Sequence, residues 1–239
     1  MKKPVLFEMY GNTALITLNR PEKRNAISQE LLIHLYNYLD KVADDPEIRA
    51  AIITGAGDSF CAGLDLGRLT TDNLMDPRGD GRGLVEILAD NTKPIIGAIN
   101  GHAMTGGFEI ALNCDFLIAS QNASFADTHA KIGIHPGWGM SQLLRQAVGI
   151  RMARQMSFTC GFFSAETALL HGLVNEVVDR EKLIPRCLEI ADEISRVNQE
   201  MLGVVRELIK KGDDMGHNDA MELEQKGFKA FLDKAGILK

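Results

Sequence analysis

Residues 95–116 read IIGAINGHAMTGGFEIALNCDF, and this stretch decides the fold because three different local structures follow one another in it. An apolar segment typical of a β-strand ends at Asn100-Gly101, the pair Gly106-Gly107 follows, and a short apolar helix carries Glu109. Glycine lets a ligand approach the main chain, and the first N–H groups of a helix have no partner inside the helix. An anion site beside an acidic side chain is therefore expected. The helix dipole also stabilises a glutamate in a first turn, so Glu109 alone could equally be structural.

A second glycine-rich strand end lies in residues 51–66, which read AIITGAGDSFCAGLDL. The apolar run ends in Gly55 and Gly57, and the small residues Cys61-Ala62-Gly63 then lead to Leu64-Asp65. The two glycine-rich strand ends are about one βα unit apart, so each can offer a backbone N–H to the same oxygen atom. The sequence therefore predicts a site built on two main-chain donors.

Four motifs in order carry a resemblance to a known family. They are RPEKRNAI at 20–27, SFCAGLDL at 59–66, NGHAMTGGFEIALNCD at 100–115 and FADTHAKIGIHPGWG at 125–139. In order and spacing they resemble the crotonase family, also called enoyl-CoA hydratase/isomerase. The likeness runs from about Val5 to Val178, and no single fragment would be specific by itself.

The resemblance implies an α/β fold, namely a crotonase-like spiral of repeated ββα units in residues 1–180. It implies that residues 181–239 form a C-terminal helical trimerisation region, and that the protein is a homotrimer or homohexamer. An acyl-CoA thioester is the implied binding partner, with coenzyme A as part of the substrate and no separate cofactor. Apolar positions within 187–208 are expected to serve either a subunit interface or an internal core.

The composition argues against several other classes of protein. A chain of 239 residues that is 45% hydrophobic can bury a core without a metal or disulfide. A net charge of -6 without a long basic run argues against a nucleic-acid-binding protein. The four cysteines are scattered without C-x-x-C spacing, so neither a zinc site nor a disulfide framework is predicted. With no signal-like N-terminus and no apolar run of membrane-spanning length, we expect a cytoplasmic protein without membrane contact.

Strands and helices alternate along the first part of the predicted structure, and helices dominate the last part. A hairpin is predicted at 5–18, with its turn at Gly11-Asn12, and a helix begins after the predicted N-cap Ser28. The polar, glycine-rich segment 67–83 has no periodicity and is expected to be a mobile loop that covers a site. The other expected strands are 49–54, 94–99, 115–119 and 173–178, and the other expected helices are 84–89, 108–113, 141–148, 151–158, 165–170, 180–196, 198–211 and 217–234.

The catalytic residues follow from matching this chain to the family motifs position by position. Chemistry at Cα of a thioester places negative charge on the carbonyl oxygen, which must meet preorganised donors. The family's two oxyanion-hole amides fall on Leu64 and Gly106, and one of its two catalytic glutamates falls on Glu109. The second glutamate position is occupied by His129, which is a departure from the family pattern.

A histidine at this position can still transfer protons near neutral pH. Glu109 and His129 could position one water molecule, with the carboxylate as base and the imidazolium as proton donor, or with these roles exchanged. Asp127 would lie on the same face as His129 if this piece is extended, and could orient its ring. A loop histidine with a purely structural hydrogen bond is the alternative. Trp138 is expected either to line the acyl group or to belong to the core.

The family match places the coenzyme A groove along two strips of sequence. These strips contain Arg24, Ala26, Ala62, Asp65 and Leu66. Lys23 or Arg24 could meet a phosphate, or could simply be solvated. Other family members carry a C-terminal lysine that reaches coenzyme A, and no such contact is assigned to Lys229, Lys234 or Lys239.

The sequence is best explained by an enoyl-CoA hydratase, which adds water across the double bond of a 2-enoyl-CoA. Because His129 replaces a glutamate on which the family's isomerases usually depend, double-bond migration is less expected than hydration. Alternatives on the same fold are an isomerase, a decarboxylase, a thioester hydrolase, and a non-catalytic scaffold that binds acyl-CoA or RNA. A Clp-type serine peptidase shares the spiral architecture, but no serine here sits at a glycine-rich elbow in a triad.

Overall fold

The structure is a computed structural model that describes residues 3–213 and 215–236, so Lys239 lies outside the described residues. The strands are β1 (Val5–Tyr10), β2 (Thr13–Leu18), β3 (Ala50–Gly55), β4 (Ser59–Cys61), β5 (Ile95–Ile99), β6 (His102–Met104), β7 (Phe116–Ser120), β8 (Ser124–Ala126), β9 (Phe163–Ser164) and β10 (Glu176–Val178). The α-helices are α1 (Gln29–Asp44), α2 (Leu84–Ala89), α3 (Gly106–Leu112), α4 (His129–Ile132), α5 (Met140–Thr159), α6 (Ala165–Leu170), α7 (Leu183–Ser195), α8 (Gln199–Asp213) and α9 (His217–Lys234). Short 3-10 helices are η1 (Pro21–Lys23), η2 (Leu66–Arg68) and η3 (Arg180–Lys182).

Within the described residues, the strands form two sheets. The larger sheet has six strands in the order β1-β2-β3-β5-β7-β10, and the smaller has four in the order β4-β6-β8-β9. The hairpin β1–β2 and the pair β8–β9 are antiparallel, and the other pairs are parallel. Parallel neighbours require crossover connections, which in this chain pass through the second sheet and the helices.

The same three-step unit recurs along the chain and produces a spiral. Strands β3, β5 and β7 each enter the larger sheet, and the strand that follows each of them, β4, β6 or β8, enters the smaller sheet. The helices α2, α3 and α4 come after these pairs in turn. Each unit thus adds one strand to both sheets beside the previous unit. This arrangement confirms the predicted α/β spiral of ββα units.

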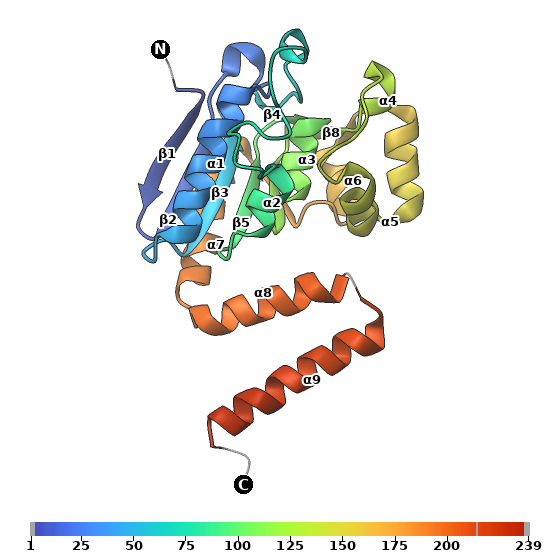
Figure 1. The fold of residues 1–239 in the computed structure, drawn as a ribbon. Helices are drawn as coiled ribbons and strands as arrows, with labels where there is room; N and C mark the ends of the chain where they lie inside the picture. The colour runs from blue at the N-terminus through green and yellow to red at the C-terminus, as the bar shows by residue number, and fades with distance from the viewer. Residues whose placement is uncertain (1–2, 214, 237–239) are drawn as a thin grey trace. The chain divides into compact units, whose positions relative to one another are not determined.

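Both faces of the central strands of the larger sheet are buried, and alternate residues of one strand serve different cores. In β3, Ala51 and Ile53 belong to the core on the α1 side, whereas Ala50 and Ile52 pack with α7. This alternation follows from the two-residue period of a strand. Figure 1 shows α1 and α7 on opposite faces of this sheet. The continuous apolar run of β3 is therefore typical of a parallel strand covered on both sides.

The described chain divides into two compact units, residues up to Ser195 and residues from Arg196 onward. Helix α7, which the sequence analysis placed in the C-terminal helical region, packs on the larger sheet through Cys187 and Ala191. In the second unit α8 and α9 contact each other. Val204, Val205 and other apolar side chains of these helices are exposed within the described structure. The apolar positions in 187–208 therefore divide between an internal core and an uncovered face.

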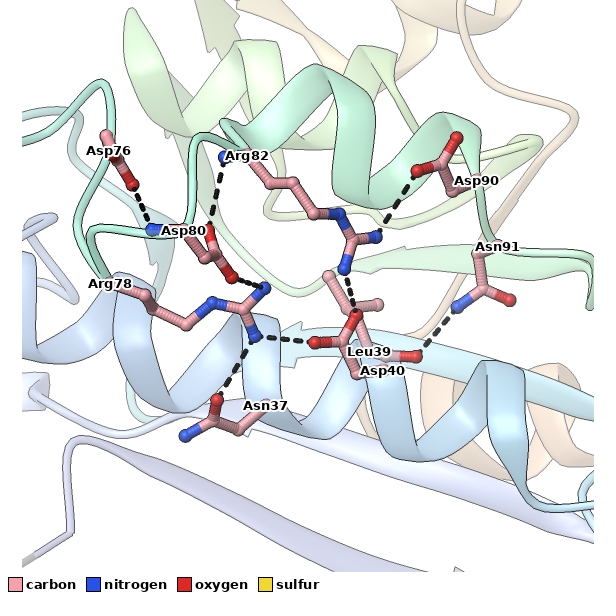
Figure 2. A network of polar contacts seen from close by, with 9 residues as sticks. All are labelled: Asn37, Leu39, Asp40, Asp76, Arg78, Asp80, Arg82, Asp90 and Asn91. Carbon is pink, nitrogen blue, oxygen red and sulfur yellow. Dashed lines mark hydrogen bonds and ion pairs between the residues drawn. The ribbon is translucent and has the colours of Figure 1, made fainter.

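The loop between η2 and α2 is held against α1 by ion pairs. Arg78 and Arg82 both bind the Asp40 carboxylate, at 2.5 Å and 3.0 Å, and Figure 2 shows the two guanidinium groups converging on it. Asp80 provides a second carboxylate for Arg78, at 2.7 Å. The polar composition that predicted mobility for residues 67–83 thus also supplies the contacts that restrain the loop.

The two helices predicted at 141–148 and 151–158 are the two halves of α5. They meet at Gly149, whose φ of 76° and ψ of 156° are not helical. Only glycine adopts such a φ without strain, so this residue separates the two halves. No helix in the described ranges is both long enough and apolar enough to cross a membrane.

Candidate active site

Helix α3 begins in a strained and crowded backbone. Thr105, the residue before the helix, has φ 50° and ψ -118°, outside the usual regions for a β-branched residue. A Cβ atom at Gly107 would lie 2.3 Å from the carbonyl oxygen of Cys61, so only glycine fits there. Strain of this kind persists where the surrounding structure enforces it, and it often marks functional sites. The first amides of α3 are thus presented by a tightly constrained turn.

The loop after β4 presents the Leu64 amide in a defined direction. Ile27 and Leu64 form an isolated parallel bridge, in which the Ile27 N–H donates to Gly63 O and the Asp65 N–H donates to Ile27 O, both at 2.8 Å. In a strand, successive backbone groups point to opposite sides. The groups of Gly63 and Asp65 face Ile27, so the Leu64 N–H points away from that neighbour. Leu64 is therefore free to donate elsewhere.

The two segments that carry the predicted oxyanion donors are neighbours. A Cβ atom at Gly63 would be 3.5 Å from the Gly106 nitrogen, and one at Gly106 would be 3.3 Å from Leu64 Cδ2. Neither the Leu64 nor the Gly106 amide donates a hydrogen bond to any residue that the structure describes. The Trp138 ring also adjoins Gly106, with Cζ3 at 3.2 Å from the same Cβ position. Two unpaired amides therefore lie in neighbouring segments, and an aromatic ring adjoins one of these segments.

Glu109 lies in the first turn of α3 and is buried, with 2% of its surface exposed. Its Oε1 accepts hydrogen bonds from the backbone N–H groups of Trp138, at 2.8 Å, and Met140, at 3.2 Å. These donors satisfy one oxygen of the carboxylate and fix its orientation. The other oxygen, Oε2, lies 3.5 Å from Nε2 of His129. Glu109 and His129 are thus brought together, as the motif analysis predicted for the pair.

His129 lies between two carboxylates. Its Nδ1 is 2.7 Å from Asp127 Oδ1, on the side of the ring opposite Glu109. Burial by itself would lower the pKa of His129, but hydrogen bonds to Asp127 and Glu109 and the charges of both carboxylates outweigh it and raise the pKa to about 9. Burial raises the pKa of Asp127, whereas hydrogen bonds from His129 and Ser157 lower it more. At neutral pH the ring is therefore an imidazolium held by two buried carboxylates.

The pairing of Asp127 with His129 arises from a turn and not from an extended strand. Strand β8 ends at Ala126, and His129 already opens the short helix α4. Asp127 Oδ1 accepts from the His129 backbone N–H, at 3.2 Å, as well as from the ring. The sequence predicts this pairing if the piece is extended, and that condition is not met, although the two side chains do contact each other. A carboxylate that caps the following turn brings the two together instead.

The residues expected to bind coenzyme A form two adjacent strips. The Ala62 N–H donates to Arg24 O at 3.0 Å, which places the strip 24–26 beside the strip 62–66. Arg24 is exposed and Leu66 is 55% exposed, whereas Ala26 is buried. Asp65 is bound by the Arg20 guanidinium at 2.9 Å. The two strips adjoin, and the carboxylate of Asp65 is engaged inside the protein.

Two buried asparagines that the sequence analysis did not single out clamp the turn between β3 and β4. Asn25 Nδ2 donates to the carbonyls of Ala56, Ser59 and Phe60. Asn100 accepts from the Gly55 N–H at 3.1 Å and donates to the same turn. Both asparagines stand inside the motifs, in RPEKRNAI and at Asn100-Gly101. An asparagine next to a glycine-rich turn is the sequence feature from which these two roles could have been predicted.

Within the described residues, no group of three or more His, Cys, Asp or Glu side chains is arranged to hold a metal ion. All four cysteines are free and buried. Burial raises the pKa of the Cys61 thiol, which adjoins Gly107.

The chain is similar to known proteins over most of its length. A sequence model of the family described as Enoyl-CoA hydratase/isomerase matches residues 8–239. A relative from Arabidopsis thaliana, "Probable enoyl-CoA hydratase 1, peroxisomal", is 39% identical over 90% of this chain and 82% of its own length. The "Short-chain-enoyl-CoA hydratase" of Clostridium acetobutylicum is 36% identical over 94% of this chain and 87% of its own.

Solved structures show the same likeness. The crystal structure of an enoyl-CoA hydratase from Mycobacterium avium is 40% identical to this chain, with a TM-score of 0.79 over 98% of both chains. The sequence match and the structural match both extend over nearly the whole chain. The chain therefore belongs to the enoyl-CoA hydratase/isomerase family.

Proposed function

We propose that this protein is an enoyl-CoA hydratase that adds water across the double bond of a 2-enoyl-CoA. The observation that carries the proposal is that two neighbouring segments leave the amides of Leu64 and Gly106 unpaired, and that the helix of Gly106 also carries Glu109 of the buried chain Glu109–His129–Asp127. The relatives named above act, by their names, on short-chain or other enoyl-CoA thioesters. Hydration needs a stabilised thioester oxygen and a pair of proton-transferring groups, and this site supplies both.

The two amides stabilise the charge that develops on the thioester oxygen. When water attacks C3, the electron pair of the double bond moves toward C2 and the carbonyl, so the oxygen becomes an enolate oxygen. Donors already in place need no reorganisation at that moment, which makes such stabilisation a large contribution to the rate. The crowded backbone around Gly107 and the bridge Ile27–Leu64 hold these donors in place.

Glu109 and His129 divide the proton transfers between them. Glu109 takes a proton from the attacking water, whose oxygen bonds to C3, and the His129 imidazolium delivers a proton to C2. A pKa near 9 favours this assignment, because His129 is already protonated at neutral pH and cannot act first as a base. The proton taken by Glu109 then returns to His129 across the 3.5 Å contact, which restores the starting state.

The remaining parts of the prediction belong to the same proposal. Arg24, Ala26, Ala62, Asp65 and Leu66 form the strips along which coenzyme A lies, with Asp65 acting through its backbone. The protein works in the cytoplasm as a homotrimer or homohexamer without a separate cofactor. Its residues 1–180 form the spiral core, and 181–239 form the helical region with the subunit interface. The exposed apolar side chains of α8 and α9 support the last point.

The test is to follow the loss of conjugated thioester absorbance with a series of enoyl-CoA substrates. Wild type should turn over at least one member of the series, and Glu109→Gln should retain the fold but lose most of the rate. Product mass must show the gain of one water. Absence of hydration in wild type, or an unchanged rate in Glu109→Gln, would contradict the proposal.

A second candidate is another acyl-CoA reaction of this fold, such as isomerisation, decarboxylation or thioester hydrolysis. His129 favours it, because this chain carries a histidine where the family pattern has a glutamate. The variant His129→Glu separates the two candidates. If wild type is inactive and this variant hydrates enoyl-CoA, the histidine serves a different reaction.

A further inference from the structure

We infer that Arg20 is a positioning residue that locks the Leu64 amide in the direction of the substrate oxygen. The inference rests on the proposed function, because it assigns a role within the same site. Arg20 follows strand β2. No role was assigned to Arg20 or to its ion pair with Asp65 from the sequence. Its guanidinium makes two hydrogen bonds, one on each side of the Ile27–Leu64 bridge that orients the Leu64 amide.

The two contacts of Arg20 bracket the Ile27–Leu64 bridge. Nη1 donates to the carbonyl of Ala26, at 2.5 Å, and Nη2 donates to Asp65 Oδ2, at 2.9 Å. Ala26 directly precedes Ile27, and Asp65 directly follows Leu64. One planar group therefore holds the two paired segments together next to the bridge. A guanidinium suits this task because its donors have a fixed fork geometry.

The register of this bridge decides whether the Leu64 N–H is available. In the observed register, Ile27 bonds to Gly63 and Asp65, which leaves the amide between them unpaired. A shift by one residue would turn the Leu64 N–H toward the 26–28 segment, where it would be consumed by a main-chain acceptor. The bridge is isolated, and the Ala62 N–H to Arg24 O bond is a further backbone contact between the two segments. The ion pair beside the bridge therefore adds a restraint that a longer ladder would otherwise supply.

The surroundings make this ion pair stronger than an ordinary surface pair. The side chains of Arg20 and Asp65 are 16% and 15% exposed. The hydrogen bond from Arg20 lowers the pKa of Asp65, so this carboxylate stays ionised at neutral pH. The backbone of Arg20 is fixed as well, because its N–H donates to Asn25 Oδ1 at 2.9 Å. Arg20 thus links two parts of the site: its backbone is held by Asn25, and its side chain holds the loop that carries Leu64.

The experiment compares three variants with wild type, namely Arg20→Gln, Arg20→Lys and Asp65→Asn. It measures kcat, KM and the carbonyl stretching frequency of a bound thioester. The carbonyl stretching frequency of bound butyryl-CoA is the key readout, since this saturated thioester cannot be hydrated and hydrogen bonds lower its frequency. We expect Arg20→Gln to reduce kcat by about 10- to 100-fold. KM should change far less, and the carbonyl frequency should move back toward its value in solution.

The other variants sharpen the expected result. Arg20→Lys cannot reach both acceptors and should lie between wild type and Arg20→Gln. The double variant Arg20→Gln/Asp65→Asn should fall little below the worse single variant, because the two residues act as one unit. Arg186→Gln is the matched control, since Arg186 on α7 also binds two carboxylates, of Glu176 in β10 and Glu189 in α7, but makes no contact with the Ile27–Leu64 bridge. It should keep the kcat and the carbonyl frequency of wild type.

Each outcome bears on the inference. If Arg20→Gln and Asp65→Asn lower only the melting temperature, and kcat and the carbonyl frequency stay at wild type, Arg20 has no positioning role. An equal loss in Arg186→Gln would also overturn the inference. If Arg20→Gln fails to fold, Arg20→Lys and Asp65→Asn provide the same comparison. Should wild type fail to hydrate enoyl-CoA, the proposed function fails, while the butyryl-CoA frequency still tests the inference by itself.

Discussion

Two ion-paired clusters in this chain use the same kinds of group in opposite arrangements. In the site, the imidazole of His129 lies between the carboxylates of Glu109 and Asp127, and all three side chains are at most 7% exposed. In the loop before α2, the carboxylate of Asp40 lies between Arg78 and Arg82 and is 32% exposed (Figure 2). In the first cluster a cation lies between two anions. In the second an anion lies between two cations, each of which also binds a further carboxylate, Asp80 or Asp90.

The difference in burial and in the central group separates chemistry from anchoring. Arginine stays protonated at any ordinary pH, so the two guanidinium groups of the loop cluster cannot exchange protons. The buried histidine, in contrast, has its pKa moved from 6.5 to about 9, within the range where proton transfer is useful. Solvent also screens the loop cluster, whereas the site has lost that screening. The first cluster is therefore built to react and the second to hold a loop.

Glu109→Gln should have the largest effect on the site. The substitution keeps an acceptor for the Trp138 and Met140 amides but removes the base, so kcat should fall by about 10³-fold. Initial rates with an enoyl-CoA substrate measure it, and the melting temperature serves as the folding control. A loss below tenfold would show that this carboxylate is not the base.

His129→Gln should lower kcat by about 10²-fold and remove the alkaline limb of the pH profile. In wild type the imidazolium is the active form, so kcat/KM should fall as the pH rises through about 9. The profile of kcat/KM against pH, in both proteins, measures this. An activity that instead rises through that pH would assign the role of base to the histidine.

Asp127→Asn should shift the alkaline fall of kcat/KM from about pH 9 toward neutral pH. The Asp127 carboxylate is one of the two groups that raise the pKa of His129, and an amide provides no compensating charge. Activity at about pH 8 should drop by about tenfold, with a smaller loss at lower pH where the ring is still protonated. Equal losses at every pH would mean that Asp127 only orients the ring.

The same pKa makes the stability of the protein depend on pH. The pKa of His129 is higher in the folded chain, about 9, than the ordinary 6.5, so folding binds the proton more tightly. This contribution is fully present below about pH 6.5 and is lost as the pH rises through about 9. Urea unfolding from about pH 6 to about pH 10 should show a steeper decline in wild type than in His129→Gln. Parallel curves would contradict the raised pKa.

Asp40→Asn should have the smallest effect and act on stability alone. It leaves Arg78 with Asp80, and removes pairs that are partly exposed and screened, so the free energy of unfolding should fall by about 1 kcal/mol. The rate of hydration should stay within about twofold of wild type, because Asp40 touches no proposed catalytic group. Denaturant unfolding and initial rates measure both quantities. A large loss of kcat would show that the loop position governs the site.

The amino-acid sequence by itself determined the strands of the larger sheet, most of the helices, the hairpin, the break at Gly149 and the two glycine-rich strand ends. It did not predict the short strands β4, β6 and β9 of the smaller sheet or the short helix α4. These features depend on residues close in the chain, through two- and 3.6-residue periodicity and through turns that only glycine or asparagine tolerates. The motifs also placed Glu109 beside His129, which the structure shows at 3.5 Å.

Only the tertiary structure decided the direction of the Leu64 amide, the protonation of His129 and the roles of Asn25 and Arg20. Each depends on groups far apart in sequence, such as Ile27 with Leu64 or Arg20 with Asp65. It also separated α7, which is packed on a sheet, from the exposed apolar face of α8, although both helices have an apolar stripe. Local pattern records which face of an element is apolar, but burial and charge depend on what finally packs against that face.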